Sequence, residues 1–192
     1  MPRKPVKKDA IDNAAIHLFA KEGLVASTIK KIAKAADVTE GALYRHYSGK
    51  DDMAWQLYQR EVQVFIEGMS DLISGEDIPL ERRVAGIVSY IFNYYKHHPD
   101  KLVFVLFTRN SFPDKYMERD EYNPDLIFVQ MLSEEMAKAT IPQADTALLL
   151  AMVRGLILEP IMMHRYGFLK THPDKHADLV IDKVWLVLKG SR

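Results

Sequence analysis

The chain has 192 residues, of which 48% are hydrophobic, 27% charged and 10% aromatic, proportions that exclude a disordered or low-complexity protein. Its 26 basic and 26 acidic side chains cancel, and the absence of cysteine excludes disulfide frameworks, cysteine nucleophiles and thiolate metal sites. No apolar segment follows the basic N-terminus, and Arg154 and Glu159 interrupt the most apolar later segment. We therefore expect a cytoplasmic protein that does not associate with a membrane.

The charges are unevenly distributed along the chain. Residues 1–50 hold ten Lys or Arg and five Asp or Glu, a net charge of +5, so residues 51–192 carry −5. A basic segment on an acidic remainder is typical of a protein of which one end meets a polyanion. A chance fluctuation of surface charge would produce the same imbalance.

The N-terminal part has the helical spacing of apolar residues. This spacing predicts three helices over residues 11–19, 28–36 and 39–47. Gly23 is a stop after the first helix, and Ser27 or Thr28 is the N-cap of the second. Asp37 and Val38 then break the pattern before the third helix.

Six more helices are predicted in the remainder. They cover residues 51–73, 79–98, 99–109, 124–140, 142–166 and 173–189. The apolar run 101–107 also fits a buried strand, but no other segment is a candidate partner strand, so a helix is favoured. Residues 111–123 are expected to form a connector. The predicted fold is all-α, with about nine helices.

The second and third predicted helices are joined by a tight connection, which is the layout of a helix-turn-helix. Packing of the third helix against its neighbours leaves several side chains toward solvent: Thr39, Glu40, Tyr44, Arg45 and His46. Gly41 has no side chain, which allows close approach to DNA. Lys30 and Lys31 lie near the positive end of the second helix, where a phosphate would stabilise them, although a solvated surface also accounts for them.

Residues 23–50, GLVASTIKKIAKAADVTEGALYRHYSGK, resemble the TetR family of transcriptional regulators. They share with the family a threonine before the bracing helix, an Ile-Ala pair within it, the Gly-x-Leu-Tyr core of the recognition helix and a lysine that opens the fourth helix. The family usually has glycine where this chain has Asp37 and phenylalanine where it has Tyr47. Aspartate tolerates the left-handed conformation that such a turn needs.

The resemblance implies a helix-turn-helix DNA-binding domain over 1–50 and a helical ligand-binding and dimerisation domain over 51–192. It implies phosphate contacts by Thr28, Tyr44, His46 or Tyr47, and Lys50, with Lys30 beside them, and places Thr39, Glu40, Gly41 and Arg45 nearest to base edges. Arg45 would contact either a guanine or a phosphate. An N-terminal basic run either contacts DNA or forms a disordered tail: Arg3, Lys4, Lys7 and Lys8.

The C-terminal part holds more aromatic and methionine residues than a small helical core needs. We expect them to line an apolar ligand pocket: Tyr90, Tyr94, Phe104, Phe107, Phe128, Met131, Met152, Met163 and Tyr166. Glu159, Arg154 or His164 would supply its polar anchor. Ordinary core packing is the alternative, and a structural ion pair is the alternative for Arg154 and Glu159.

The last two predicted helices are apolar on more than one face, which predicts a homodimer built as a four-helix bundle. One stripe comprises Ala177, Val180, Ile181, Val184 and Leu188, with Leu179, Trp185 and Leu186 on other faces; the preceding helix offers Leu149, Met152, Val153 and Leu156.

The sequence thus predicts a sequence-specific DNA-binding transcriptional regulator, a repressor released by a small apolar or aromatic ligand, with duplex operator DNA and a second copy of itself as partners. The alternative is a DNA-bound regulator controlled by a protein partner without a small ligand. An enzyme is disfavoured, because no HExxH pattern, glycine-rich phosphate loop or serine elbow occurs. No cofactor or metal is expected, since Pro173 separates His172 from His176 and turns them to different faces.

Overall fold

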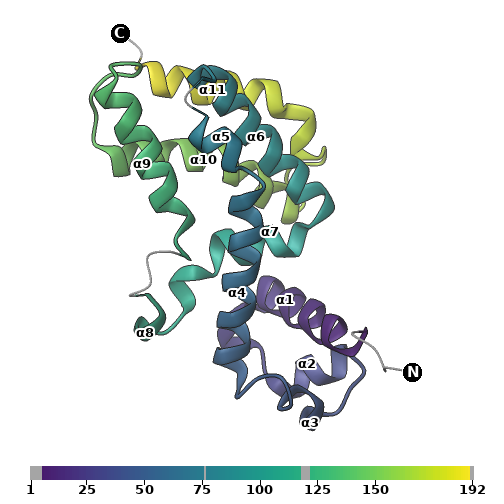
Figure 1. Cartoon of the computed structure of the whole chain (residues 1–192). Helices are drawn as coiled ribbons and strands as arrows, with labels where there is room; N and C mark the ends of the chain where they lie inside the picture. Colours follow the sequence, from purple (N-terminus) through teal and green to yellow (C-terminus); the bar gives the residue numbers. More distant parts are fainter. Residues whose placement is uncertain (1–5, 76, 118–121, 191–192) are drawn as a thin grey trace. The chain divides into compact units, whose positions relative to one another are not determined.

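The computed structural model describes residues 6–75, 77–117 and 122–190, and within these ranges the chain is all-α, without a strand (Figure 1). The apolar run 101–107 is therefore helical, as favoured. The described residues form eleven α-helices rather than the nine expected. The two additional helices are α5 (Ser70–Ser74), separated from α4 (Lys50–Glu67), and α8 (Asp114–Met117), which lies inside the predicted connector.

The chain divides into two compact units. Unit 1 comprises residues 1–65 and 99–123, and unit 2 comprises residues 66–98 and 124–192. The boundary predicted at residue 50 divides the chain by function and differs from this division by packing, because most of α4 and residues 99–123 belong to the same compact unit as the N-terminal helices. The functional boundary stays a prediction.

Unit 1 is built around α1 (Val6–Ala26), which packs against α2 (Ile29–Ala35) and α7 (Pro99–Phe107). It also contains α3 (Glu40–Leu43), α8, most of α4 and the short 3₁₀ helix η1 (Arg109–Ser111). Aromatic rings fill its core: Phe19 stacks on Phe104 with ring centroids 5.7 Å apart, and the edge of Phe104 meets Tyr58. Phe104 is thus a core residue of unit 1 and not part of a pocket wall in unit 2.

Unit 2 contains four longer helices, α6 (Leu80–His97), α9 (Pro124–Ala137), α10 (Thr146–Arg165) and α11 (Ala177–Lys189), together with α5 and the 3₁₀ helix η3 (Pro173–His176). Both α6 and α10 pack against α11, and α9 packs against α10 and α5. The core side of α11 is the stripe Val180, Val184 and Leu188, all buried. The repeat of apolar residues in this helix therefore predicted its inner face correctly.

Two of the predicted helix limits were wrong. The helix expected over 51–73 ends at Glu67, and the next residue, Gly68, lies so close to Tyr90 that an added Cβ would collide with that ring. Pro79 is the N-cap of α6 and not its first residue. By contrast, Gly23 interrupts α1 as expected, with a φ of 80°.

One helix in the described part of the chain, α10, is long and apolar enough to cross a membrane by length and composition. The same test is passed by core helices of soluble proteins. Here α10 packs against α9, α11 and α6, and Arg154 pairs with Asp125 at 2.7 Å. This ion pair bears out the structural alternative for Arg154, whereas Glu159 is exposed.

A buried ion pair ties the helices of unit 2 together. The Arg83 guanidinium lies 3.0 Å from a Glu135 carboxylate oxygen, and both side chains are almost completely buried. The guanidinium also donates hydrogen bonds to the carbonyl oxygens of Leu72 and Ile73, at the end of α5. One arginine therefore joins α6 to both α9 and α5, and each of its hydrogen bonds helps to hold these helices together.

Replacing Arg83 by Met should leave Glu135 buried without its guanidinium, so we expect the free energy of unfolding to fall by about 3–5 kcal/mol. The exposed neighbour Arg82 provides the control, and Arg82→Met should change the free energy by less than about 0.5 kcal/mol. Urea unfolding at neutral pH measures both. The double variant R83M/E135L should recover part of the loss; a double variant less stable than R83M would contradict this explanation.

Candidate nucleic-acid interface

The connection between α2 and α3 is a tight turn that local side chains define. The Thr28 hydroxyl oxygen accepts a hydrogen bond from the Lys31 N–H at 3.2 Å, so Thr28 and not Ser27 caps α2. Asp37 adopts the left-handed conformation, with a φ of 53°. The Val38 N–H then donates to the Ala33 carbonyl oxygen at 3.0 Å, which closes the turn. Asp37 thus takes the conformation for which the resembled family uses glycine.

The third helix, α3, is short and packs through a buried side chain. It extends only from Glu40 to Leu43, and residues 44–46 continue as turns rather than as the helix expected to Tyr47. Leu43 is completely buried, as is Ile32 of α2. Because these apolar side chains hold the inner side, the other side of α3 faces solvent.

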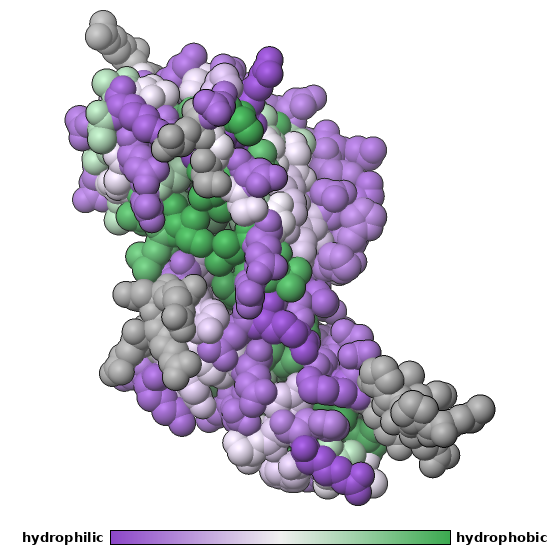
Figure 2. Space-filling model, in the orientation of Figure 1, coloured by the Kyte–Doolittle hydropathy of each residue, from purple (hydrophilic) through white to green (hydrophobic). Residues whose placement is uncertain are grey.

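The solvent side carries the polar residues that the sequence predicted there. All of the following are exposed: Thr28, Lys30, Thr39, Glu40, Gly41, Tyr44, Arg45 and His46. An added Cβ at Gly41 would meet only the Thr39 hydroxyl, at 4.0 Å, so the backbone is open to a close approach. The lower end of Figure 2, which holds α2 and α3, is mainly polar on the face drawn.

A hollow of about 640 Å³ adjoins this surface, between α2 and the turn that follows α3. Its lining includes Lys34, Thr39, Arg45 and His46. The surface of unit 1 is therefore concave beside the exposed residues, and these polar groups surround the recess.

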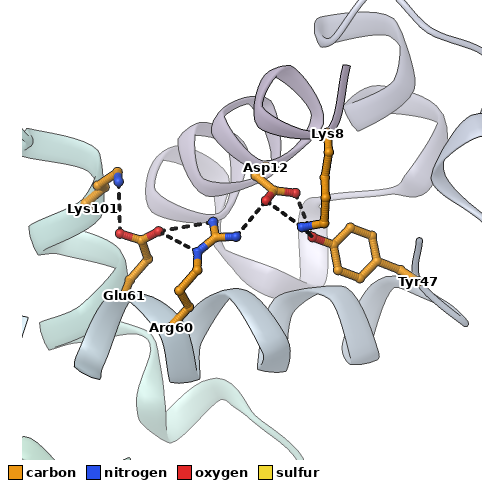
Figure 3. Close-up of polar contacts among 6 residues, drawn as sticks. All are labelled: Lys8, Asp12, Tyr47, Arg60, Glu61 and Lys101. Carbon is orange, nitrogen blue, oxygen red and sulfur yellow. Dashed lines mark hydrogen bonds and ion pairs between the residues drawn. The ribbon is translucent and has the colours of Figure 1, made fainter. Parts of the chain in front are cut away.

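Tyr47 does not belong to this exposed set. Its ring is buried, and its hydroxyl donates a hydrogen bond of 2.6 Å to Asp12 of α1 (Figure 3). Because the Tyr47 hydroxyl points inward, the expectation that it contacts a phosphate is wrong. Of the two predicted alternatives, His46 or Tyr47, only His46 is exposed. The hydroxyl that distinguishes this chain from the usual phenylalanine instead fastens the end of the α3 segment to α1.

Asp12 is the centre of a charged cluster that the sequence analysis missed. Its carboxylate, only 2% exposed, accepts hydrogen bonds from Tyr47, from Lys8 at 3.0 Å and from Arg60 of α4 at 2.7 Å (Figure 3). Asp12 lies between apolar residues on the buried face of the first predicted helix. An acidic residue at such a position needs a partner, and this was the available signal.

The cluster continues from Arg60 to α7. The Arg60 guanidinium contacts Glu61 at 3.2 Å, and the other Glu61 carboxylate oxygen lies 3.0 Å from the Lys101 ammonium (Figure 3). Glu61 is buried, so the two cations compensate its charge. The chain of charges therefore joins the segment after α3 to α1, α4 and α7 within unit 1.

These contacts alter the ionisation of the cluster. Burial alone would raise the pKa of Asp12, but the hydrogen bonds from Tyr47, Arg60 and Lys8 outweigh it and hold that pKa below its ordinary value. Burial, followed by the hydrogen bond to Asp12, raises the pKa of Tyr47. Asp12 is therefore ionised and Tyr47 is a neutral donor at neutral pH.

Lys50, at the start of α4, is half-buried. Its ammonium donates a hydrogen bond of 2.6 Å to the carbonyl oxygen of Leu24, near the end of α1. Lys31 is similarly engaged, by the Glu22 carboxylate at 2.6 Å and the Ala26 carbonyl oxygen at 3.0 Å. Lys30, in contrast, has no partner among the described residues. Arg3 and Lys4 lie outside the described residues.

The residues predicted to line a ligand pocket are divided between the two units. Phe104 and Phe107 belong to unit 1, while Tyr90, Tyr94, Phe128 and Met131 belong to unit 2. Tyr94 and Met131 are buried there. The Tyr90 and Tyr94 rings lie 5.8 Å apart.

The predicted pocket residues of α10 point in different directions. Met152 and Met163 are 49% and 37% exposed, and Glu159 and Tyr166 are also exposed, so these four do not line the interior of unit 2. His164 is half-buried, and its Nδ1 lies 3.0 Å from the Tyr95 hydroxyl. Among the described residues, no group of three or more His, Cys, Asp or Glu is arranged to hold a metal ion.

Comparison with known proteins identifies the N-terminal part. The family model of bacterial regulatory proteins, tetR family, matches residues 11–56. The HTH-type transcriptional repressor KstR2 of Mycobacterium tuberculosis (strain H37Rv) is 30% identical over 89 residues, which are 46% of this chain and 44% of the repressor. The fatty acid metabolism regulator protein of Bacillus subtilis (strain 168) is 31% identical over 93 residues, 48% and 47% of the two chains. Each match thus spans less than half of the relative's length.

The whole fold also has counterparts among solved structures. The transcriptional regulator FadR from Bacillus subtilis, solved in complex with stearoyl-CoA, superposes with a TM-score of 0.74 over 96% of this chain and 100% of that one, at 22% identity. At this identity the likeness concerns the fold. It confirms an N-terminal helix-turn-helix domain followed by a larger helical domain.

Replacement of Asp12 by Asn tests the charged cluster. Because the pKa of Asp12 is lowered in the fold, its carboxylate stabilises the protein above the ordinary aspartate pKa of about 3.9, and this stabilisation is lost as the pH falls through the lowered value. We expect D12N to be less stable at pH 7 by about 1–3 kcal/mol, and the difference to shrink below about pH 4. Denaturant unfolding from pH 7 to pH 3 measures it, with the exposed Asp9→Asn as control. A difference independent of pH would contradict the assignment.

Proposed function

Since the chain belongs to the tetR family of bacterial regulatory proteins, we propose that it is a sequence-specific DNA-binding transcriptional repressor that a small apolar or aromatic ligand releases from its operator. The observation that carries the proposal is the exposed polar side of α3 and its following turn, held by Leu43 and the Asp12–Tyr47 contact. We assign DNA binding to residues 1–50, ligand binding and dimerisation to residues 51–192, and the cytoplasm as its location.

The proposed DNA contacts follow from exposure, except for Lys50, which is half-buried and is assigned from the family resemblance. Thr28, Lys30, Tyr44, His46 and Lys50 are assigned to phosphates, and Thr39, Glu40, Gly41 and Arg45 to base edges. Phosphate contacts position the protein, whereas base contacts determine the sequence that it prefers. Tyr47 takes a positioning role, because its hydroxyl is bound to Asp12.

Two alanine variants separate these roles. Arg45→Ala should weaken binding to the operator by about 1–3 kcal/mol, and should weaken binding to random DNA much less, if Arg45 contacts a base. Lys30→Ala should weaken binding to both and reduce the slope of log affinity against log salt concentration by about 1. Fluorescence anisotropy with operator and random duplexes measures both effects.

Lys175→Ala, in η3 of unit 2, is the control and should change neither quantity. An equal loss for the two DNAs in Arg45→Ala would reassign Arg45 to a phosphate. Absence of binding to any genomic fragment at low salt would refute the proposed function.

The proposed ligand site lies in the C-terminal domain. The supporting residues are Tyr90, Tyr94, Phe128 and Met131 as apolar wall and His164 as polar neighbour. One relative is a fatty acid metabolism regulator protein, and the solved FadR structure holds stearoyl-CoA. A long-chain acyl-CoA is therefore the first probe, because an acyl chain is bound best by apolar and aromatic side chains such as these.

Stearoyl-CoA should lower the affinity for operator DNA, and operator DNA should lower the affinity for stearoyl-CoA by the same factor, since the coupling free energy is reciprocal. Anisotropy and isothermal titration calorimetry measure the two factors, with free CoA and stearate as separate arms. Tight ligand binding with unchanged DNA affinity would refute ligand release. If a broader screen of apolar and aromatic compounds yields no binder, control by a protein partner becomes the better explanation.

We also propose a homodimer formed through α10 and α11, because both helices leave apolar residues exposed. On α10 these are Leu148, Met152 and Met163, and on α11 they are Leu179 and Leu186. Of the predicted stripe of α10, Met152 is exposed, Leu149 is buried, and Val153 and Leu156 are half-buried. Two exposed apolar helices from each of two subunits would complete a four-helix bundle.

A further inference from the structure

The residues that line the recess beside α2 and α3 divide by exposure into a floor and a rim. The four apolar residues form the floor: Ile11 and Ala33 are buried, whereas Val38 and Ala42 are half-buried. The five polar residues form the rim, and all of them are exposed: Lys34, Asp37, Thr39, Arg45 and His46. Solvent therefore reaches the apolar floor of the recess at Val38 and Ala42.

Backbone hydrogen bonds fix the part of the floor that solvent reaches. The Val38 N–H donates to the Ala33 carbonyl oxygen at 3.0 Å, and the Ala42 N–H donates to the Thr39 carbonyl oxygen at 2.9 Å. Val38 directly follows Asp37, whose left-handed conformation defines the turn. The floor is thus formed before a ligand arrives, so binding bears little cost for ordering it.

The rim carries more positive than negative charge. Lys34 and Arg45 are cationic, and Asp37 is the acid among the lining residues. Within the described part of the chain, neither the Lys34 ammonium nor the Arg45 guanidinium has a hydrogen bond or an ion pair. Both cations are therefore available to the acceptor atoms of a ligand, such as phosphate or guanine oxygens. Lys34 was not among the DNA contacts that the sequence predicted.

The surroundings of the recess restrict the chemistry of its ligand. Thr39, Arg45 and His46 line the recess and belong to the surface assigned to DNA, so the recess opens on that surface. In the major groove of duplex DNA, thymine is the base that presents an apolar group, its 5-methyl group. The same groove offers guanine acceptors and is bordered by phosphates, which suits a cationic rim.

We propose that the recess receives the 5-methyl group of a thymine in the operator, with Val38 and Ala42 as its contacts and Lys34 on a neighbouring phosphate. This inference rests on the proposed DNA-binding function. A cytosine in the same place presents an amino group and no methyl group, and that amino group would lose its water against an apolar floor. Val38 and Ala42 thus determine specificity, although neither belongs to the polar residues assigned to base edges.

Exchange of thymine for uracil tests the contact, because deoxyuridine lacks the 5-methyl group and pairs in the same way. The probe is a duplex operator that the full chain selects from genomic fragments, with one thymine exchanged at a time. At one position or more, the affinity should fall about fourfold, which is the effect of taking one methyl group out of an apolar contact. Fluorescence anisotropy measures each dissociation constant.

Two variants link that loss to the floor. Val38→Thr keeps the side-chain shape and exchanges a methyl group for a hydroxyl, and Ala42→Ser adds a hydroxyl. In each variant, the ratio of the dissociation constants for the uracil and thymine duplexes should fall below about two. Val25→Thr makes the same exchange at a residue that is 88% exposed on α1, and should leave this ratio at about four. A ratio measured within one variant is independent of the fraction of folded protein.

A third variant tests the rim. Lys34→Ala should reduce the slope of log affinity against log salt concentration by about 1, for operator and random DNA alike. An unchanged slope would overturn the assignment of Lys34 to a phosphate.

The outcomes separate the thymine contact from DNA binding itself. A scan in which no thymine matters would overturn the thymine contact, and so would a uracil effect that persists in both floor variants, since its cause would then lie in the DNA. Either result leaves the proposed function intact. Absence of binding to any genomic fragment would overturn the proposed function.

Discussion

The position of the exposed polar side of α3 depends on one buried carboxylate. Asp12 accepts hydrogen bonds from three donors that belong to three different segments: Lys8 on its own helix, Tyr47 after α3 and Arg60 on α4. Without these donors its charge would be too costly to bury. The hydrogen bonds from Tyr47 and Arg60 to Asp12 therefore hold the end of the α3 segment against α1 and α4.

Charged residues serve different purposes at different depths in this chain. Arg83 and Glu135 are buried and paired, so they join helices within unit 2. Arg45 is exposed, and its side chain is free to meet a ligand such as a nucleic acid. Glu159 is exposed on α10 near the exposed Met152 and Met163, so a cost of leaving its charge unpaired arises only if that surface is covered. The depth of a charge therefore indicates whether it acts in folding or in recognition.

Much of the fold could be predicted from local signals, because helices begin and end through contacts between near neighbours. The cap at Thr28 and the left-handed turn at Asp37 are of this kind. The close approach of Gly68 to Tyr90 could not be predicted, since that ring lies on another helix. The exposed side of α3 followed from periodicity, but the inward hydroxyl of Tyr47 depended on a distant acid. Residue type alone could not show that Met152 faces outward, because α10 is apolar on two sides.

The shortness of α3 has a consequence for how this surface can change over evolutionary time. Tyr44, Arg45 and His46 lie in turns, beyond the last helical residue, Leu43. Helix propensity therefore places little constraint on them, and the buried anchors on either side, Leu43 and Tyr47, keep the backbone in position. If these three residues contact DNA as proposed, substitutions there can alter binding preference without loss of the scaffold, so duplicated genes could diverge in their targets through very few mutations.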